Sequence, residues 1–160
     1  MIITEETYRA RRHIAFYAFV APLLMAALIN VSDRSQQVQL GIVTAIAALM
    51  ALILYVVLGA VQVRFNQHSI TYTTILKSRE LTWANLRSVY VKKKHTGKSS
   101  HRFLVFENTA GKQVIEINIA LFSRRSLQAI CSAACGLAPR AALDERASGF
   151  ANGEFPWYIR

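Results

Sequence analysis

The stretch Leu40–Val61 reads LGIVTAIAALMALILYVVLGAV and is followed at once by QVRF, residues 62–65. The first segment is uncharged and as a helix would extend about 33 Å, against a bilayer hydrocarbon core of about 30 Å. The second segment alternates polar and apolar residues, which is the period of a β-strand. Near Val63 the chain therefore changes from a membrane-spanning helix to a β-domain, and this break decides the fold.

A second uncharged apolar stretch, Ile14–Val31, precedes the first and would extend about 27 Å as a helix. Only helices or closed barrels satisfy every backbone group inside a bilayer, and two segments cannot close a barrel. The sequence therefore predicts a two-helix transmembrane hairpin over residues 14–62, after a short segment 1–13. A cleaved signal peptide is the alternative for the first stretch. Glu5, Glu6 and the length of the apolar run argue against it.

Charge next to the two stretches predicts their orientation. Residues 9–12 contain three arginines, whereas the linker Ser32–Gln39 carries one cation, Arg34, beside Asp33. The positive-inside rule places both termini in the cytoplasm and the linker outside. Neither stretch contains an ionisable Asp, Glu, Lys, Arg or His, so a transport pathway is not expected.

Small residues in the second stretch form two pairs at four-residue spacing, Gly41 with Ala45 and Ala47 with Ala51. Such pairs let membrane helices approach closely. They predict packing of the two spans on each other, and the alternative is contact with another membrane protein or with a second copy of the chain.

The net charge of +10 belongs mainly to the part after the break. Residues 63–146 contain fourteen Lys and Arg against five Asp and Glu, which gives +9. This balance suits anionic membrane lipids or an acidic protein. Nucleic acid is not an expected partner, because no stacking platform accompanies the lysines.

Alternating and β-branched residues predict an antiparallel sheet followed by one helix. Turns are expected at Lys77–Glu80 and Asn108–Lys112, and a loop at His95–Ser100. Ser123 is the expected first cap of the helix, and Trp83 is an expected core residue. The predicted strands and helix are Val61–Asn66, Ile70–Leu76, Leu81–Trp83, Arg87–Lys94, a strand containing Phe103 and Val105, Val114–Ile119, and the helix Ser123–Cys135.

The segments ITY at residues 70–72 and LTWANLRSV at 81–89 resemble a pleckstrin-homology-like (PH-like) domain of the bacterial type. The whole layout is similar to small bacterial inner-membrane proteins, including the YcxB-like group. The resemblance implies a membrane α+β protein: the hairpin, then a bent antiparallel sheet or barrel over residues 63–138, capped by a C-terminal helix. Residues 139–160 would be a tail. It also implies the bacterial cytoplasmic membrane and a binding module without catalytic residues. The segment before the first span is short and lacks the extra strand that some of these proteins have there.

One cluster of cations follows the predicted strand Arg87–Lys94. Its members are Lys92, Lys93, Lys94, Lys98 and Arg102. Each basic residue near an anionic leaflet contributes about 1 kcal/mol, so the cluster is a candidate site for anionic lipid or an acidic partner. The alternative is a solvated hairpin loop. Gly97-Lys98-Ser99 is not part of a phosphate-binding P-loop, because Lys92 stands where that motif needs glycine.

The tail contains four aromatic residues that are unfavourable in water: Phe150, Phe155, Trp157 and Tyr158. They predict docking on a partner or on the headgroup zone of the membrane. The alternative is a fold-back onto the domain. Arg124 and Arg125 begin the helix, where the helix dipole disfavours cations. This indicates either a contact of these charges with the membrane or a partner, or ordinary solvent exposure on the first turn.

No arrangement of residues predicts catalysis, a cofactor or a metal site. The two histidines near the basic cluster, His95 and His101, have no cysteine or paired carboxylate beside them. The sequence thus predicts a non-catalytic scaffold or accessory subunit that contacts another membrane protein or a second copy of itself. Recognition of anionic phospholipid headgroups is the alternative function.

Overall fold

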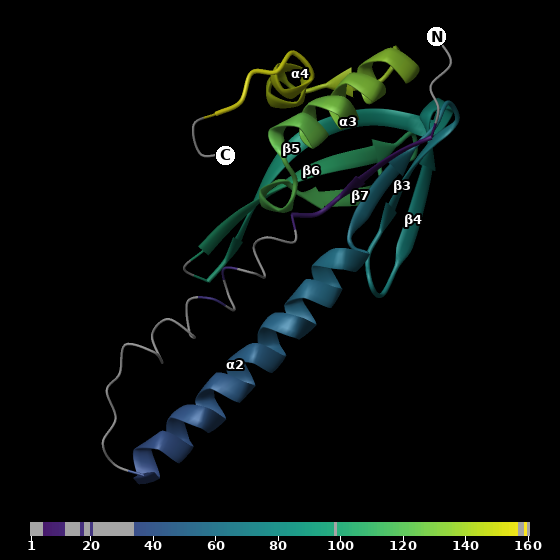
Figure 1. Cartoon of the computed structure of the whole chain (residues 1–160). Coiled ribbons are helices and arrows are strands. Elements are labelled where there is room, and N and C mark those ends of the chain that lie inside the picture. Colours follow the sequence, from purple (N-terminus) through teal and green to yellow (C-terminus); the bar gives the residue numbers. More distant parts are fainter. Residues whose placement is uncertain are drawn as a thin grey trace. The chain divides into compact units, whose positions relative to one another are not determined.

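The computed structural model describes residues 5–11, 17, 20, 34–97, 99–156 and 159 (Figure 1). The chain divides into two compact units. We call Met1–Ala10 with Val61–Arg160 the β-unit, and Arg11–Ala60 the helical unit.

The helical unit contains helix α2, which runs from Arg34 to Ala60. Its segment Val38–Ala60 is long and apolar enough to cross a membrane, and among the described residues no other helix is. Large apolar side chains such as Met50 are more than half exposed along it. The predicted second stretch is therefore confirmed as a helix of spanning length. The predicted first span, Ile14–Val31, lies outside the described residues except for Tyr17 and Val20, so the structure shows one candidate span and not the predicted pair.

The covered side chains of α2 follow one helical stripe. Ala47 and Leu54 are partly covered, and Ala51 and Leu58 are buried. Spacings of three and four residues place these side chains on one face. Of the two small-residue pairs, Ala47 with Ala51 lies on this covered stripe, whereas Gly41 and Ala45 are exposed.

The β-unit contains two four-stranded sheets. The first has the order β1 (Glu6–Arg9), β2 (Gln62–Phe65), β3 (Ser69–Thr73), β4 (Ser78–Thr82). The second has the order β7 (Gln113–Asn118), β6 (Ser99–Asn108), β5 (Leu86–Thr96), β8 (Ala142–Leu143). All neighbours are antiparallel except β5 and β8, which are parallel. The helices are η1 (Trp83–Asn85), η2 (Ile119–Leu121), α3 (Arg124–Leu137) and α4 (Glu145–Ala151).

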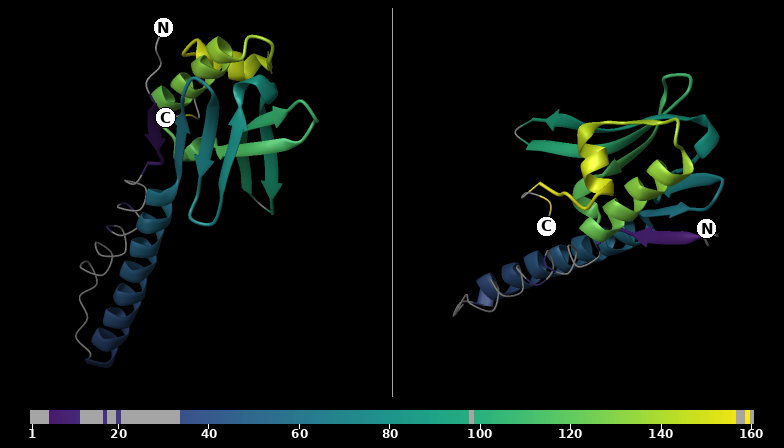
Figure 2. Two further views of the ribbon diagram at one scale, coloured as in Figure 1. Left: turned by 90° about the vertical axis from the view of Figure 1, so that its right-hand side faces the viewer. Right: turned by 90° about the horizontal axis from the view of Figure 1, so that it is seen from above.

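One hydrophobic core joins both sheets to the C-terminal helices. Leu127 and Ile130 of α3 are fully buried and share this core with Val63 and Ile115 of the two sheets. Figure 2 shows α3 and α4 at one end of the β-unit, with the β3–β4 and β5–β6 turns at the other end. The predicted order of antiparallel strands followed by a C-terminal helix is confirmed.

Two local predictions are confirmed in detail. The Ser123 hydroxyl caps α3 by accepting a hydrogen bond from the Ser126 backbone N–H at 3.0 Å. Trp83 is buried, and its indole Nε1–H donates to the Asn66 carbonyl at 2.8 Å.

The expectation that no strand precedes the first apolar stretch is wrong. Strand β1 pairs antiparallel with β2, with Arg9 opposite Gln62. Beyond the strands, the Ala10 N–H donates to the Val61 carbonyl at 3.0 Å. The chain therefore leaves the β-unit and returns to it at hydrogen-bonded neighbours. A four-residue strand has too little alternation to be recognised, and its partner lies more than fifty residues away.

The turn expected at Lys77–Glu80 lies earlier, at Thr74–Lys77. The Thr74 N–H donates to the Lys77 carbonyl at 2.8 Å, and the Lys77 N–H donates to the Thr74 hydroxyl at 3.2 Å. These hydrogen bonds form a turn with Ile75 and Leu76 at its centre, although the apolar side chains of these two residues favoured a strand.

The hairpin of β5 and β6 is longer than expected. Paired residues continue to Thr96 and Ser99, so the two strands extend into the predicted loop His95–Ser100. Gly97 takes φ +59°, a conformation that glycine adopts without steric cost.

The C-terminal tail is part of the β-unit and not an irregular extension. It forms β8 and α4, and Phe150 and Ile159 are buried in the core.

Candidate functional site

The alternation of β5 divides the predicted basic cluster between two faces of the sheet. Lys93 shares a face with Val91 and the buried Val89, while Lys92 and Lys94 point to the opposite, outer face. Arg102 lies directly opposite Lys93 on β6. Lys98 lies outside the described residues. The structure therefore does not gather the four described cations into one patch.

On the outer face, Lys92 and Lys94 contact side chains of β7. The Lys92 ammonium donates to Gln113 Oε1 at 3.3 Å, and the Lys94 ammonium pairs with Glu116. Lys94 also lies over the Phe103 ring, 5.2 Å from its centroid. Both lysines thus have partners within the sheet.

A polar chain continues this outer face. Gln113 Nε2 donates to the Tyr90 hydroxyl at 2.9 Å, and that hydroxyl donates to Glu107 Oε2 at 3.3 Å. Burial, followed by the negative charge of Glu107, raises the pKa of Tyr90, so the phenol stays protonated and remains a donor. The network accounts for the position of Lys92 without a ligand.

On the other face, Lys93 and Arg102 form a cross-strand pair of like charge. Like charges directly opposite each other repel, so the two cations together give this end of the hairpin a positive potential. Lys93 and its neighbour on the same face, His95, are exposed. Lys93, Arg102 and His95 form a short basic strip on this face. Lys93 and Arg102 are the members of the predicted headgroup site that lie here.

The predicted docking tail folds onto the β-unit over much of its length. Phe150 is 1% exposed and its ring stacks on Phe155, with centroids 5.2 Å apart. Arg124 holds the end of the tail, since its Nε donates to the Ile159 carbonyl at 2.6 Å. Trp157 and Tyr158 lie outside the described residues. The arginine on the first turn of α3 therefore has a structural use.

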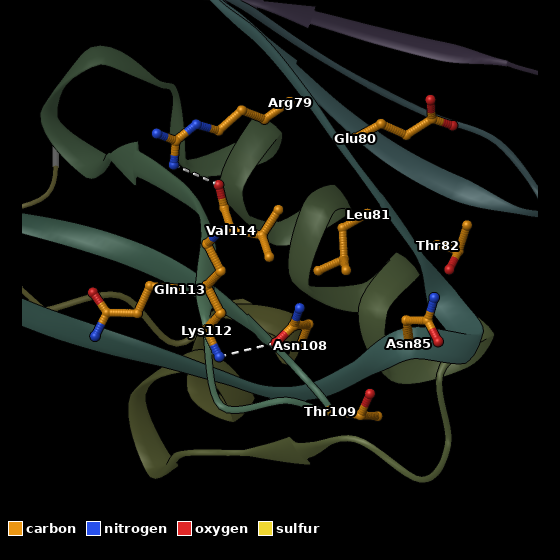
Figure 3. A pocket seen from close by; sticks show the side chains of 10 residues that line it. All are labelled: Arg79, Glu80, Leu81, Thr82, Asn85, Asn108, Thr109, Lys112, Gln113 and Val114. Carbon is orange, nitrogen blue, oxygen red and sulfur yellow. Dashed lines mark hydrogen bonds between the residues drawn. The ribbon is translucent and has the colours of Figure 1, made fainter.

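A hollow of about 800 Å³ lies between β4 and β7, the edge strands of the two sheets (Figure 3). We call it the edge slot. Its lining residues are Arg79, Glu80, Leu81, Thr82, Asn85, Asn108, Thr109, Lys112, Gln113 and Val114.

One hydrogen bond lies at each end of the edge slot. At one end Arg79 Nη1 donates to the Val114 carbonyl at 2.9 Å, and in the described part of the chain this is the one hydrogen bond between β4 and β7. At the other end the Thr109 N–H donates to the Asn85 carbonyl at 3.0 Å. The turn there is fixed by Asn108, whose Oδ1 accepts from the Lys112 N–H at 2.9 Å.

Backbone groups of β4 point into the edge slot. The Trp83 N–H donates to the His68 carbonyl, and β4 pairs with β3 in regular register from there. Hydrogen-bonded and non-hydrogen-bonded pairs alternate in an antiparallel ladder. The N–H and C=O groups of alternate residues therefore face away from β3, and these residues are Ser78, Glu80 and Thr82.

The chemistry of the edge slot suits an extended chain with an acidic group. Arg79 and Lys112 supply positive charge, and both side chains are exposed. The carboxylate of Glu80 is already engaged, since Glu80 Oε1 accepts from the Ser69 hydroxyl at 2.6 Å. The sequence alone does not indicate this site, because its two walls are about thirty residues apart and no motif joins them.

Within the described residues, no group of three His, Cys, Asp or Glu side chains converges as a metal site would require. In the comparisons with known proteins, no family model, no curated protein and no solved structure matches the chain.

Proposed function

We propose that this protein is a membrane-anchored, non-catalytic binding module that holds an extended segment of a partner protein in the edge slot. The observation that carries the proposal is the unpaired edge of β4 facing a basic hollow. Exposed strand edges pair readily with other chains, and strand addition is a recurrent mode of peptide recognition. The segment would add its backbone to β4 and present a carboxylate to Arg79 or Lys112.

The anchor is proposed to be the two-helix hairpin at the bacterial cytoplasmic membrane, with both termini in the cytoplasm. The pairing of β1 with β2 supports it, since Ala10 and Val61 are hydrogen-bonded and would therefore lie on the same side of a bilayer that the chain crosses. A chain that starts and returns on one side crosses an even number of times. If α2 supplies one crossing, residues before Arg34 must supply another.

A PH-like architecture is also part of the proposal. Two antiparallel sheets, one shared core and a C-terminal helix buried along one face support it. PH-like domains act by binding and not by catalysis, which agrees with a scaffold or accessory subunit.

The test is a proline substitution at the free edge of β4. Thr82 has φ −73°, which proline adopts without strain, and its N–H faces the edge slot. Thr82→Pro therefore removes one donor from the edge while leaving the β3–β4 pairing intact. A photo-crosslinking residue at Thr109, inside the slot, reports a partner in native membranes.

The expected result is a crosslink from Thr109 that Thr82→Pro abolishes and that Arg79→Gln weakens at least fivefold. Thr82→Val retains the N–H and is the matched control for the proline; Arg140→Gln, at an exposed residue outside the slot, is the control for charge. A crosslink that persists unchanged in Thr82→Pro would exclude strand addition at β4.

A second candidate function is recognition of anionic phospholipid headgroups, favoured by the like-charged pair of Lys93 and Arg102. In proteoliposomes, anionic lipid should slow amide exchange at the tip of β5 and β6, and 0.5 M salt should reverse it because salt screens exposed charges. The double variant Lys93→Gln with Arg102→Gln should lose the difference. Equal exchange in neutral and anionic vesicles would contradict this function.

A further inference from the structure

The β3–β4 turn carries two exposed apolar side chains. Leu76 is 86% exposed and Ile75 is 52% exposed, although both belong to a unit with a well-filled core. The turn is also closed: Thr74 donates its N–H and its hydroxyl to the Lys77 carbonyl, at 2.8 and 3.0 Å. A closed turn with its cross-turn groups paired can enter an apolar medium at lower cost than an open loop.

The strand register places this turn beside the point where the chain enters and leaves the helical unit. Gln62 pairs with Arg9 on one side and with Thr73 on the other, and Thr73 pairs with Ser78. This row of residues is one end of the first sheet. Ala10 and Val61 lie just beyond this row, at the same end of the sheet. Val61 directly follows Ala60, the last residue of α2. If α2 crosses the bilayer, this end lies at the membrane surface.

The charges at this end complement an anionic surface. Lys77 follows Leu76 directly, and neither the turn Thr74–Lys77 nor the segment His95–Ser100 contains an acidic residue. The left view of Figure 2 shows the β5–β6 tip and the β3–β4 turn both directed away from α3 and α4. Lys93 and His95 on that hairpin are exposed.

We propose that Ile75 and Leu76 form a membrane-inserting tip that enters the interfacial layer of the leaflet from which α2 emerges. The tip would give the β-unit a second attachment to the bilayer, with Lys77 at the level of the lipid phosphates. A protein partner could contact Ile75 and Leu76 anywhere on the surface, whereas insertion into the membrane requires them at the end of the sheet where the chain enters α2. The inference rests on α2 crossing the membrane, which is part of the proposed function, and it is independent of the edge slot.

The experiment uses the full chain in vesicles of mixed anionic and neutral phospholipid, with an environment-sensitive fluorophore on a single cysteine. Cys131→Ala and Cys135→Ser remove the native thiols, and Leu76→Cys introduces the label. Ala110→Cys is the matched control, because it is an exposed turn residue after β6, at the opposite end of that strand from the β5–β6 tip. Leu49→Cys on α2 reports the anchor itself.

Lipids with a spin label near the headgroup should quench the Leu76 probe at least threefold more than the Ala110 probe, while aqueous iodide should quench the Ala110 probe more. Replacing Lys77 with Gln should reduce the lipid quenching at Leu76 in anionic vesicles. Quenching of the Leu49 probe by deeply labelled lipid shows that α2 spans.

Two results would overturn the inference while leaving the anchor in place. In the first, Leu49 is quenched from within the bilayer, but Leu76 behaves like Ala110. In the second, the Leu76 probe is shielded from both quenchers and its shielding rises with the ratio of protein to lipid, which would assign the tip to contact between two copies of the chain. An unquenched Leu49 probe would instead overturn the spanning role of α2 and, with it, the basis for the tip.

Discussion

Asp144 joins the C-terminal helix to the edge of the second sheet. Its Oδ1 accepts from the Ala147 N–H at 2.7 Å and caps α4, while its Oδ2 accepts from the Val91 N–H of β5 at 2.9 Å. Both carboxylate oxygens are therefore in use, which the sequence alone did not indicate because the two donors are more than fifty residues apart.

Asp144→Ala should lower the free energy of unfolding by about 1 kcal/mol for the lost cap and by a further 1–3 kcal/mol for the unpaired N–H of Val91. Asp144→Asn retains one acceptor and should fall between the wild type and the alanine variant. Thermal unfolding of the full chain in detergent micelles, followed by circular dichroism, measures the order. An asparagine variant as unstable as alanine would contradict a divided role for the two oxygens.

The two cysteines, Cys131 and Cys135, should differ sharply in reactivity. Burial raises the pKa of the Cys131 thiol from 9.0 to about 12, whereas Cys135 is exposed. At pH 8 one thiol should react rapidly with an aromatic disulfide reagent, and Cys135→Ser should remove that reaction. Cys131 should react only on unfolding, and two thiols reacting at equal rates in the folded protein would refute its burial.

The same shift predicts a dependence of stability on pH. The folded state holds the Cys131 proton more tightly than the unfolded state does, because its pKa is the higher one. The stability that this thiol contributes is therefore complete below pH 9 and is lost as the pH rises toward 12. Cys131→Ala should remove this part of the alkaline dependence, which denaturant titrations at pH 8 and pH 11 would measure.

At the level of elements, the sequence predicted the helices and strands whose polar and apolar residues repeat with a regular period. The change from an uncharged helix to the alternating strand Gln62–Phe65 is visible in the sequence itself. The helix cap at Ser123 was also predictable, because it depends only on residues close together in the sequence. The turn at Thr74–Lys77 was misplaced because side-chain hydrogen bonds of Thr74 decide it. The edge slot has no local signal, because pairing across the fold, and not sequence neighbourhood, brings β4 near β7.

Strand β1 makes the clearest prediction at this scale. Thr7 lies opposite Arg64, and the hydrogen bond from Ala10 to Val61 makes Thr7 with Arg64 a non-hydrogen-bonded pair, the closer of the two kinds. Cysteines at these two positions, with the native thiols removed, should form a disulfide under mild oxidation. Thr7→Cys with Thr71→Cys is the control, since Thr71 lies one strand further away. Equal crosslinking of both pairs would contradict the register.

For the whole molecule, the pairing of β1 with β2 constrains how the proposed anchor could cross the bilayer. Residues before the apolar segment and residues after it belong to one unit, so the proposed anchor would have to cross the bilayer an even number of times between them. If the apolar segment Val38–Ala60 crosses once, as proposed, the start of α2 lies on the opposite side of the membrane from β1 and β2. The strand pairing constrains the proposed topology independently of the positive-inside rule, which predicts the same arrangement.

A membrane-impermeant maleimide applied to intact bacterial cells tests this topology in the full chain without Cys131 and Cys135. Gln37→Cys, near the start of α2, should be labelled from outside, whereas Thr7→Cys and Ala110→Cys should be labelled only after the membrane is permeabilised. Labelling of Thr7 and Gln37 from the same side would mean that the residues before α2 do not cross. Since β1 would then be separated from β2 by the bilayer, the same result would require the disulfide between positions 7 and 64 to fail, so the two measurements check each other.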